Sequence, residues 1–241
     1  MRPDRRYTVW FHYANTGDAD LLAPLFTVTS ENALMRLSTD DPWQTGRIQF
    51  LGLNHEPPVH MLPPGYHRSL PILIQTRGSA GARVEFDYVY VEYKKDTVDW
   101  SRYSHLLRPP DTGSAEWAAL WPLVEDYLGG TWSGYFDALY YEAASLDAVG
   151  FPANDLRYLL PSMARRAAGL PVARIAGRVM NSETGVPVTD ATMTAFNAAD
   201  AENWAARTVT DSEGRFLFEP LTDGTYELFI EGYYFDARHI Y

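Results

Sequence analysis

The amino-acid sequence predicts a mainly β protein, with two antiparallel β-sandwiches joined by a small three-helix segment. Near both ends of the chain, short stretches of alternating apolar and polar residues are separated by Gly, Pro and Asp turns, which is typical of antiparallel strands. Between them the apolar residues recur every three or four positions, which is the period of an amphipathic helix. We therefore expect a first sandwich at residues 1–96, a helical bridge at 97–170 and a second sandwich at 171–241.

The first segment contains about six stretches with strand character, which is enough for an immunoglobulin-like sandwich. Asn15-Thr-Gly-Asp is a turn sequence, and Leu62-Pro-Pro-Gly leads into a later strand. These two features resemble the CARDB/NEW3-type modules of large bacterial surface proteins. The strands are expected at 7–13, 25–29, 33–37, 47–53, 69–76 and 82–93.

The middle segment predicts three helices. The first begins near Trp117, and the second runs from Trp132 to a stop at Gly150. The third has its N-cap at Asn154 or Asp155 and stops at Gly169. Prolines within the first and third helices should kink them or restart their first turn. The residues expected to be buried by the third helix are Leu156, Leu159, Leu160 and Met163.

The last segment has the strand and turn order of a small sandwich, with a Gly-requiring turn at 211–214. It resembles the carboxypeptidase regulatory-like domain, also described as transthyretin-like or CnaB-like. That resemblance implies a module that holds, spaces or displays something. Many CnaB domains carry a Lys–Asn isopeptide bond, but residues 171–241 contain no lysine, so this bond is excluded here. Inward-facing side chains are expected at Ala191, Met193, Ala195, Phe216, Phe218, Tyr226, Leu228 and Ile230.

In the regulatory-like family, further strands follow the element that corresponds here to Gly232-Tyr233. Since the sequence stops soon afterwards, we expect an unpaired sheet edge that another strand completes. The partner would be another copy of the chain or a further domain of a longer polypeptide. The residues expected at this joint are Phe235, Arg238, Ile240 and Tyr241, together with Tyr7, Val9 and Phe11 in the first strand.

Composition narrows the functional classes. The chain has 241 residues, of which 46% are hydrophobic, so it can bury a sizeable core. A net charge of −11 argues against a nucleic-acid partner, and no apolar run approaches the roughly 20 residues that span a bilayer. There are no cysteines for disulfides or thiolate metal sites. No signal peptide is recognisable, so the chain is either cytoplasmic or a segment of a larger exported protein. We expect the second, a fragment of an extracellular or cell-surface protein.

Three other kinds of site remain open. Trp43, Trp100 and Trp204 lie in loop-like contexts and could stack on sugars, as in an accessory carbohydrate-binding module of a secreted hydrolase. His55, His60 and His67 could converge on a metal, although their spacing and Pro57-Pro58 exclude the helical zinc-protease motif. Calcium could bind paired loop carboxylates. These pairs are Asp18 with Asp20, Asp40 with Asp41, and Asp211 with Glu213.

The sequence contains no nucleophile elbow, phosphate loop or recognisable acid–base pair, so we expect no enzymatic activity and no cofactor. The favoured prediction is a structural or adhesive, self-assembling module of a bacterial extracellular assembly. Edge-strand pairing would join it to its neighbours.

Overall fold

The computed structural model describes residues 5–54, 56–77, 83–108, 113–148, 150–170, 172–221 and 224–231. The predicted mainly β fold with antiparallel sheets and three longer helices is confirmed. The chain divides into two compact units. The first comprises Met1–Asp147 with Pro152–Ala168, and the second comprises Ala148–Phe151 with Gly169–Tyr241. The helices thus belong to the same compact unit as the N-terminal strands. The predicted domain boundaries at 1–96, 97–170 and 171–241 stay a prediction.

The N-terminal unit is built on one five-stranded antiparallel sheet, with strand order β1-β6-β3-β4 and β7 paired to β3. Strands β2 and β5 form a separate two-stranded sheet, which was not predicted. The strands are β1 (Arg6–Ala14), β2 (Leu21–Leu22), β3 (Leu25–Arg36), β4 (Gln44–Leu51), β5 (Met61–Leu62), β6 (His67–Thr76) and β7 (Asp87–Val91).

Strand β3 makes this sheet fold into two layers. The sequence predicts two strands at 25–29 and 33–37, but the structure has one long strand with a register shift between Ser30 and Leu34. Before the shift β3 pairs with β7, and after it β3 pairs with β6 on the same side. An irregularity of this kind bends a strand and raises its twist, which lets the layer of β1 and β6 face the layer of β3, β4 and β7.

The core of the unit lies between these layers. Phe11 of β1 has its ring centroid 4.9 Å from that of Phe26 on β3 and 5.3 Å from that of Phe50 on β4. Both distances suit edge-to-face aromatic packing. The buried residues of this core are Phe26, Val28, Met35, Ile48, Phe50, Leu70, Ile72 and Ile74.

The three predicted helices are confirmed, and Asp155 is the N-cap of the third, accepting a hydrogen bond from the backbone N–H of Arg157. Each of the two helices that contain a proline, Pro122 or Pro161, continues through it, so neither restarts there and the alternative, a kink, stays a prediction. The helical elements are η1 (Trp100–Arg102), α1 (Ser104–Leu107), α2 (Ser114–Leu128), α3 (Trp132–Asp147) and α4 (Leu156–Ala167).

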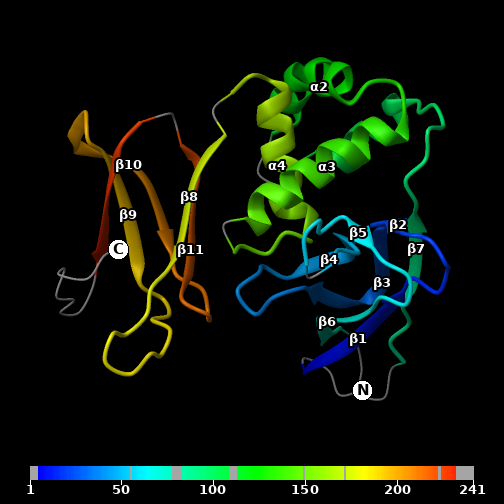
Figure 1. Ribbon diagram of the computed structural model, residues 1–241, viewed down its shortest axis with the longest axis horizontal. Helices are drawn as coiled ribbons and strands as arrows, with labels where there is room; N and C mark the ends of the chain where they lie inside the picture. The colour runs from blue at the N-terminus through cyan, green and yellow to red at the C-terminus, as the bar shows by residue number, and fades with distance from the viewer. Residues whose placement is uncertain are drawn as a thin grey trace. The chain divides into compact units, whose positions relative to one another are not determined.

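Helices α2, α3 and α4 lie together on one side of the N-terminal strands (Figure 1). The Tyr140 hydroxyl of α3 donates a hydrogen bond of 2.7 Å to the backbone oxygen of Ala23, and its ring stacks on His60 at 5.1 Å between centroids. The backbone N–H of Leu51 bonds to the oxygen of Asn154, just before α4. The helices therefore pack on the strands they follow.

A buried ion-pair network also joins α4 to the loop between β3 and β4. The Arg157 guanidinium contacts Asp41 at 2.6 Å and also pairs with Asp155. Tyr158 donates its hydroxyl to Asp41 at 2.8 Å. The two carboxylate side chains are each 3% exposed and that of Arg157 is 14% exposed. Burial raises the pKa of Asp155, with the Arg157 hydrogen bonds and charge acting in the opposite direction.

The C-terminal unit is a small two-layer sandwich, with one sheet in the order β10-β9-β12 and the other formed by β11 and β8. Its core contains the buried Met193, Ala195, Phe216 and Phe218, with Tyr226, Leu228 and Ile230 packed against them, as predicted. A Cβ at Gly177 would lie 2.7 Å from the Phe216 ring, so this close packing requires glycine. The strands are β8 (Ala173–Arg178), β9 (Thr192–Asn197), β10 (Asp200–Val209), β11 (Arg215–Leu221) and β12 (Tyr226–Glu231).

Candidate functional site

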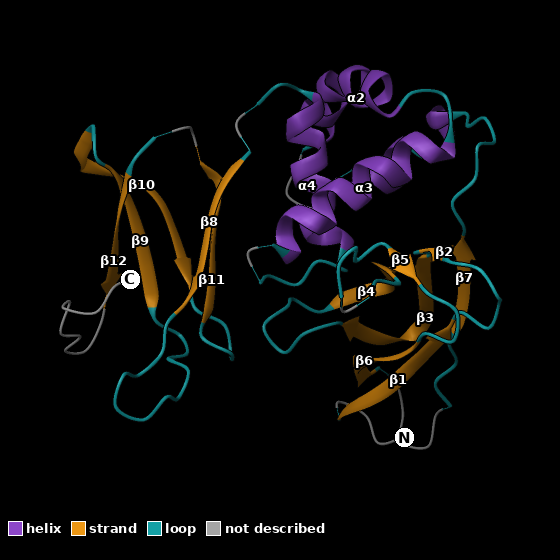
Figure 2. Cartoon of the chain, viewed as in Figure 1, coloured by secondary structure: helices purple, strands orange, loops and turns teal. Residues whose placement is uncertain are grey.

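Strand β1 forms one end of the N-terminal sheet (Figure 2). Over the part of the chain that the structure describes, its nine residues pair with β6 alone. Exposure alternates strictly along it, with the even-numbered residues exposed and the odd-numbered ones half-buried. Its backbone groups on the other side have no strand beside them among the described residues, which is the situation in which sheets recruit another strand.

The hydrogen-bond pattern shows which residues carry this open edge. The oxygen of Arg5 accepts a bond from the N–H of Thr76, and the N–H of Asn15 donates to the oxygen of Tyr66. Both contacts fall on odd-numbered residues of the N-terminal chain. Since bonding alternates along an antiparallel pair, the odd-numbered residues between them bond to β6. The N–H and C=O groups of Thr8, Trp10 and His12 consequently point away from β6, toward the open edge.

The exposed side chains of β1 include one large aromatic group. Trp10 is 56% exposed and lies opposite Pro71 on β6. His12 lies opposite Ser69, with its Nδ1 2.7 Å from the serine hydroxyl. A tryptophan on the mostly polar exposed face of an edge strand offers apolar contact area beside the unpaired backbone.

The joint residues predicted in this strand belong to its half-buried set, and their role at a joint stays a prediction. Tyr7, Val9 and Phe11 are half-buried against the core of the sandwich. Their alternate neighbours, Thr8 and Trp10, are the accessible ones. The sequence contained a signal for this, because Trp10 belongs to the polar set of the alternation, where a large apolar residue has no core to fill.

Other edges of the sheet are shorter or covered. At the end of β4, Leu51 bonds to Asn154, and Phe50 forms a bridge with Asp155, so the chain before α4 covers this end of the β4 edge. Strand β7 has five residues. Strand β1 is longer, and between residues 8 and 13 it lacks the proline, lysine or bulge with which proteins commonly blunt an edge.

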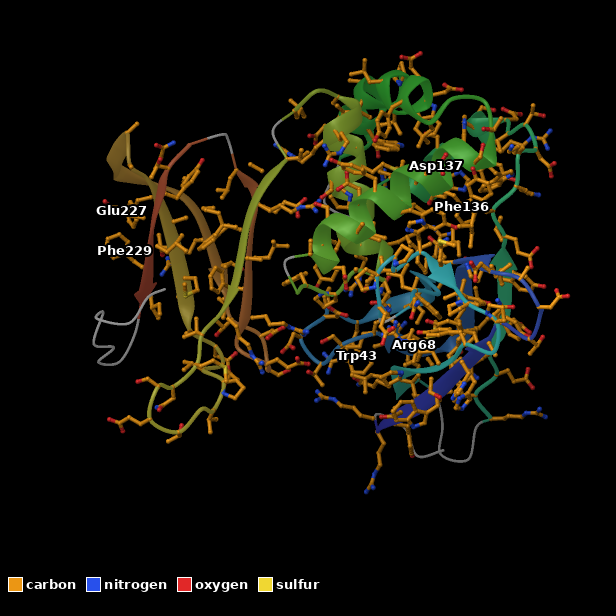
Figure 3. All side chains as sticks on the ribbon, viewed as in Figure 1. Trp43, Arg68, Phe136, Asp137, Glu227 and Phe229 are labelled. Carbon is orange, nitrogen blue, oxygen red and sulfur yellow. The ribbon has the colours of Figure 1, made fainter. Side chains whose placement is uncertain are left out.

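The three tryptophans considered for sugar binding do not form a shared platform. Trp100 is 2% exposed, with its indole N–H bonded to the oxygen of Gly129, which corrects its assignment to an open loop. Trp43, labelled in Figure 3, is half-buried, with the Arg36 guanidinium 4.2 Å from its ring centroid and that of Arg6 at 5.9 Å. The side chain of Trp204 lies outside the described residues.

The histidines considered for a metal site are only partly described. His60 stacks on Tyr140, and the Nδ1 of His67 lies 3.4 Å from the backbone oxygen of Gly65. His55 lies outside the described residues. Within the described ranges, no three His, Asp or Glu side chains form a group that could hold a metal ion.

Three of the carboxylates considered for calcium already contact guanidinium groups, and one of them is Glu213, which lies 3.3 Å from Arg215. Asp41 is paired with Arg157, and Asp211 is paired with Arg215 at 2.8 Å. Asp211 also accepts backbone bonds from Glu213 and Arg215, so it shapes the turn before β11. Calcium binding stays a prediction.

A second exposed apolar surface lies on the C-terminal unit. Phe229 of β12 is 50% exposed and packs edge-to-face on Phe196 at 5.3 Å between centroids. Figure 3 shows Phe229 and Glu227 on the side of their sheet turned away from β8 and β11. The predicted terminal joint residues Phe235, Arg238, Ile240 and Tyr241 lie outside the described residues.

Comparison of the sequence with known protein families agrees with the fold of the C-terminal unit. Searches of curated proteins and of solved structures gave no match. None of the helices within the described ranges is both long and apolar enough to cross a membrane. The N-terminal resemblance to CARDB/NEW3-type modules stays a prediction. The predicted C-terminal resemblance is confirmed, because residues 174–240 match the family model of the carboxypeptidase regulatory-like domain, a non-catalytic, immunoglobulin-like structural module.

Proposed function

We propose that this chain is a non-enzymatic structural and adhesive module of a bacterial extracellular or cell-surface assembly, and that its β1 edge joins it to a neighbour. The regulatory-like match supports a structural role, and domains of this type occur in extracellular proteins. The observation that carries the proposal is the open edge of β1, nine residues long, with Thr8, Trp10 and His12 presenting backbone groups and exposed side chains.

An added β-strand is the partner that this edge fits best. Each backbone N–H and C=O pointing outward finds its complement in an extended chain, and no single side chain can satisfy the whole row. Nine residues span roughly 30 Å, which gives a long line of main-chain bonds. The alternating side chains of the added strand would then select the partner, with Trp10 as the main apolar contact on the outer side.

Carbohydrate binding has less support. The accessible aromatic surface required for sugar stacking is missing at Trp100, which is buried. At Trp43, two arginines lie against the indole ring.

A strand-shaped probe tests the proposed role of the edge. We expect a lysine-flanked peptide of alternating Thr and Val to slow amide hydrogen exchange at Thr8, Trp10 and His12 by about tenfold or more at saturation. Thr8→Pro should abolish this protection, because proline removes an edge-facing N–H but no bond to β6.

Thr8→Ala is the matched control for the proline variant, since it keeps the backbone donor. It should bind the peptide like the parent chain, and both variants should retain the thermal transition of the N-terminal unit. Equal protection by the peptide in Thr8→Pro and in the parent chain would contradict a role for the β1 edge.

A further inference from the structure

We propose that the strand completing the β1 edge is β1 of a second copy of this chain, paired antiparallel across a two-fold axis at Trp10. The inference rests on the proposed function of the same edge and names its partner. In the resulting dimer, the two five-stranded sheets become one continuous sheet.

The backbone pattern restricts how two copies can pair. Because the even-numbered residues of β1 carry the outward groups, an antiparallel pair must bond even residues to even residues. Full overlap of the nine-residue strand then sets Trp10 opposite Trp10, Thr8 opposite His12, and Arg6 opposite Ala14. Sliding the pair by two residues keeps the bonding pattern but shortens the overlap, so the register centred on Trp10 makes the most bonds.

The side chains on both faces of the strand suit this register. On the outer face, the two Trp10 side chains become cross-strand neighbours, a pairing that stabilises antiparallel sheets. On the core-facing side, Val9 comes to lie opposite Phe11, and Tyr7 opposite Tyr13. All four are only half-buried in the single chain, so the partner's rings would extend the core of each sandwich.

Charge along the chain favours the antiparallel arrangement. Arg5 and Arg6 are exposed at the start of β1, whereas Asp18 and Asp20 are exposed just after its end. Antiparallel pairing brings the basic end of each copy toward the acidic end of the other. Parallel pairing would place like charges side by side, which is unfavourable for a chain whose net charge is already −11.

Cysteine cross-linking tests the register, because the chain has no cysteine of its own. In the expected dimer the two Cβ atoms of residue 10 lie about 4.5–5.5 Å apart. This distance starts at the upper limit of the Cβ–Cβ range of disulfides, about 4.5 Å, and is within reach of a short thiol cross-linker. We expect Trp10→Cys, oxidised or treated with such a linker, to give at least about tenfold more covalent dimer than Thr8→Cys. The two residues at position 8 would lie about 13 Å apart along the strands.

Two further measurements test the dimer even if the Trp10→Cys variant binds its second copy more weakly. The double variant Thr8→Cys/His12→Cys should cross-link at both pairs, and the parent chain should show a concentration-dependent dimer in sedimentation. Equal cross-linking at positions 8 and 10 would overturn the register. A parent chain that stays monomeric, while the strand peptide still protects the edge, would overturn the second copy as partner and leave the proposed function standing.

Discussion

Arg157→Met should lower the free energy of unfolding of the N-terminal unit by about 3–5 kcal/mol, the usual cost of removing one partner from a buried ion pair. The guanidinium is shared by Asp41 and Asp155, whose side chains are each 3% exposed. Without it, two buried carboxylates lie close together with no cation between them, and Asp41 keeps the hydrogen bonds from the Tyr158 hydroxyl and the backbone N–H of Ser38. Denaturant unfolding of the N-terminal unit would measure the loss.

The loss should depend on pH in a defined direction. The charge and hydrogen bonds of Arg157 oppose the effect of burial on the pKa of Asp155, so their removal should raise that pKa further. A carboxyl group with a raised pKa in the folded state binds protons more readily there than in the unfolded state. Stability therefore falls as pH rises from the ordinary carboxyl value through the raised one. The deficit of Arg157→Met should be larger at pH 7 than at pH 5.

Arg157→Lys is the matched control, because it keeps a cation but loses the bidentate geometry. It should lose less stability than Arg157→Met and show a weaker pH dependence. A deficit of Arg157→Met that stays constant from pH 5 to pH 7 would contradict the role of buried, ionised carboxylates.

Core truncations should report which segments unfold together. Phe50→Ala should destabilise the N-terminal unit by about 3–5 kcal/mol, since the ring is fully buried against Phe11 and Phe26. Leu139→Ala in α3 should cost about 2–5 kcal/mol and lower the same calorimetric transition, because α3 packs in that unit. Phe218→Ala should lower only the transition of the C-terminal unit.

These three variants serve as controls for one another. If Leu139→Ala shifts a different calorimetric transition from the one that Phe50→Ala shifts, the helices unfold separately from the N-terminal strands. Identical shifts of a single transition by all three variants would show that the two units unfold as one.

Local patterns in the sequence were sufficient for most of the elements. The third helix could be predicted with its N-cap and buried residues because both depend on spacing within a few turns. The inward set of the C-terminal sandwich follows from strict alternation, as at Phe216 and Phe218. The continuous β3 strand could not be predicted, because its unity depends on pairing with β4 and β6, which lie far away in the sequence.

The same distinction applies to the candidate site. Strand β1 and its alternation are visible in the sequence, but that it ends a sheet is a property of the assembled topology. The sequence-based joint named Tyr7, Val9 and Phe11 from the apolar set, and their role there stays a prediction. The exposed residues of the strand are the even-numbered ones between them. The network of Arg157 with Asp41 was also invisible, because it joins residues more than a hundred positions apart.

Amide hydrogen exchange on the dilute chain tests most directly whether β1 is an open edge. Thr8, Trp10 and His12 should exchange at least about a hundredfold faster than Val9 and Phe11, whose N–H groups bond to β6. Raising the chain concentration should then slow the three fast amides selectively. Equal protection of all five amides in the dilute chain would show that the edge is already covered and would contradict the account.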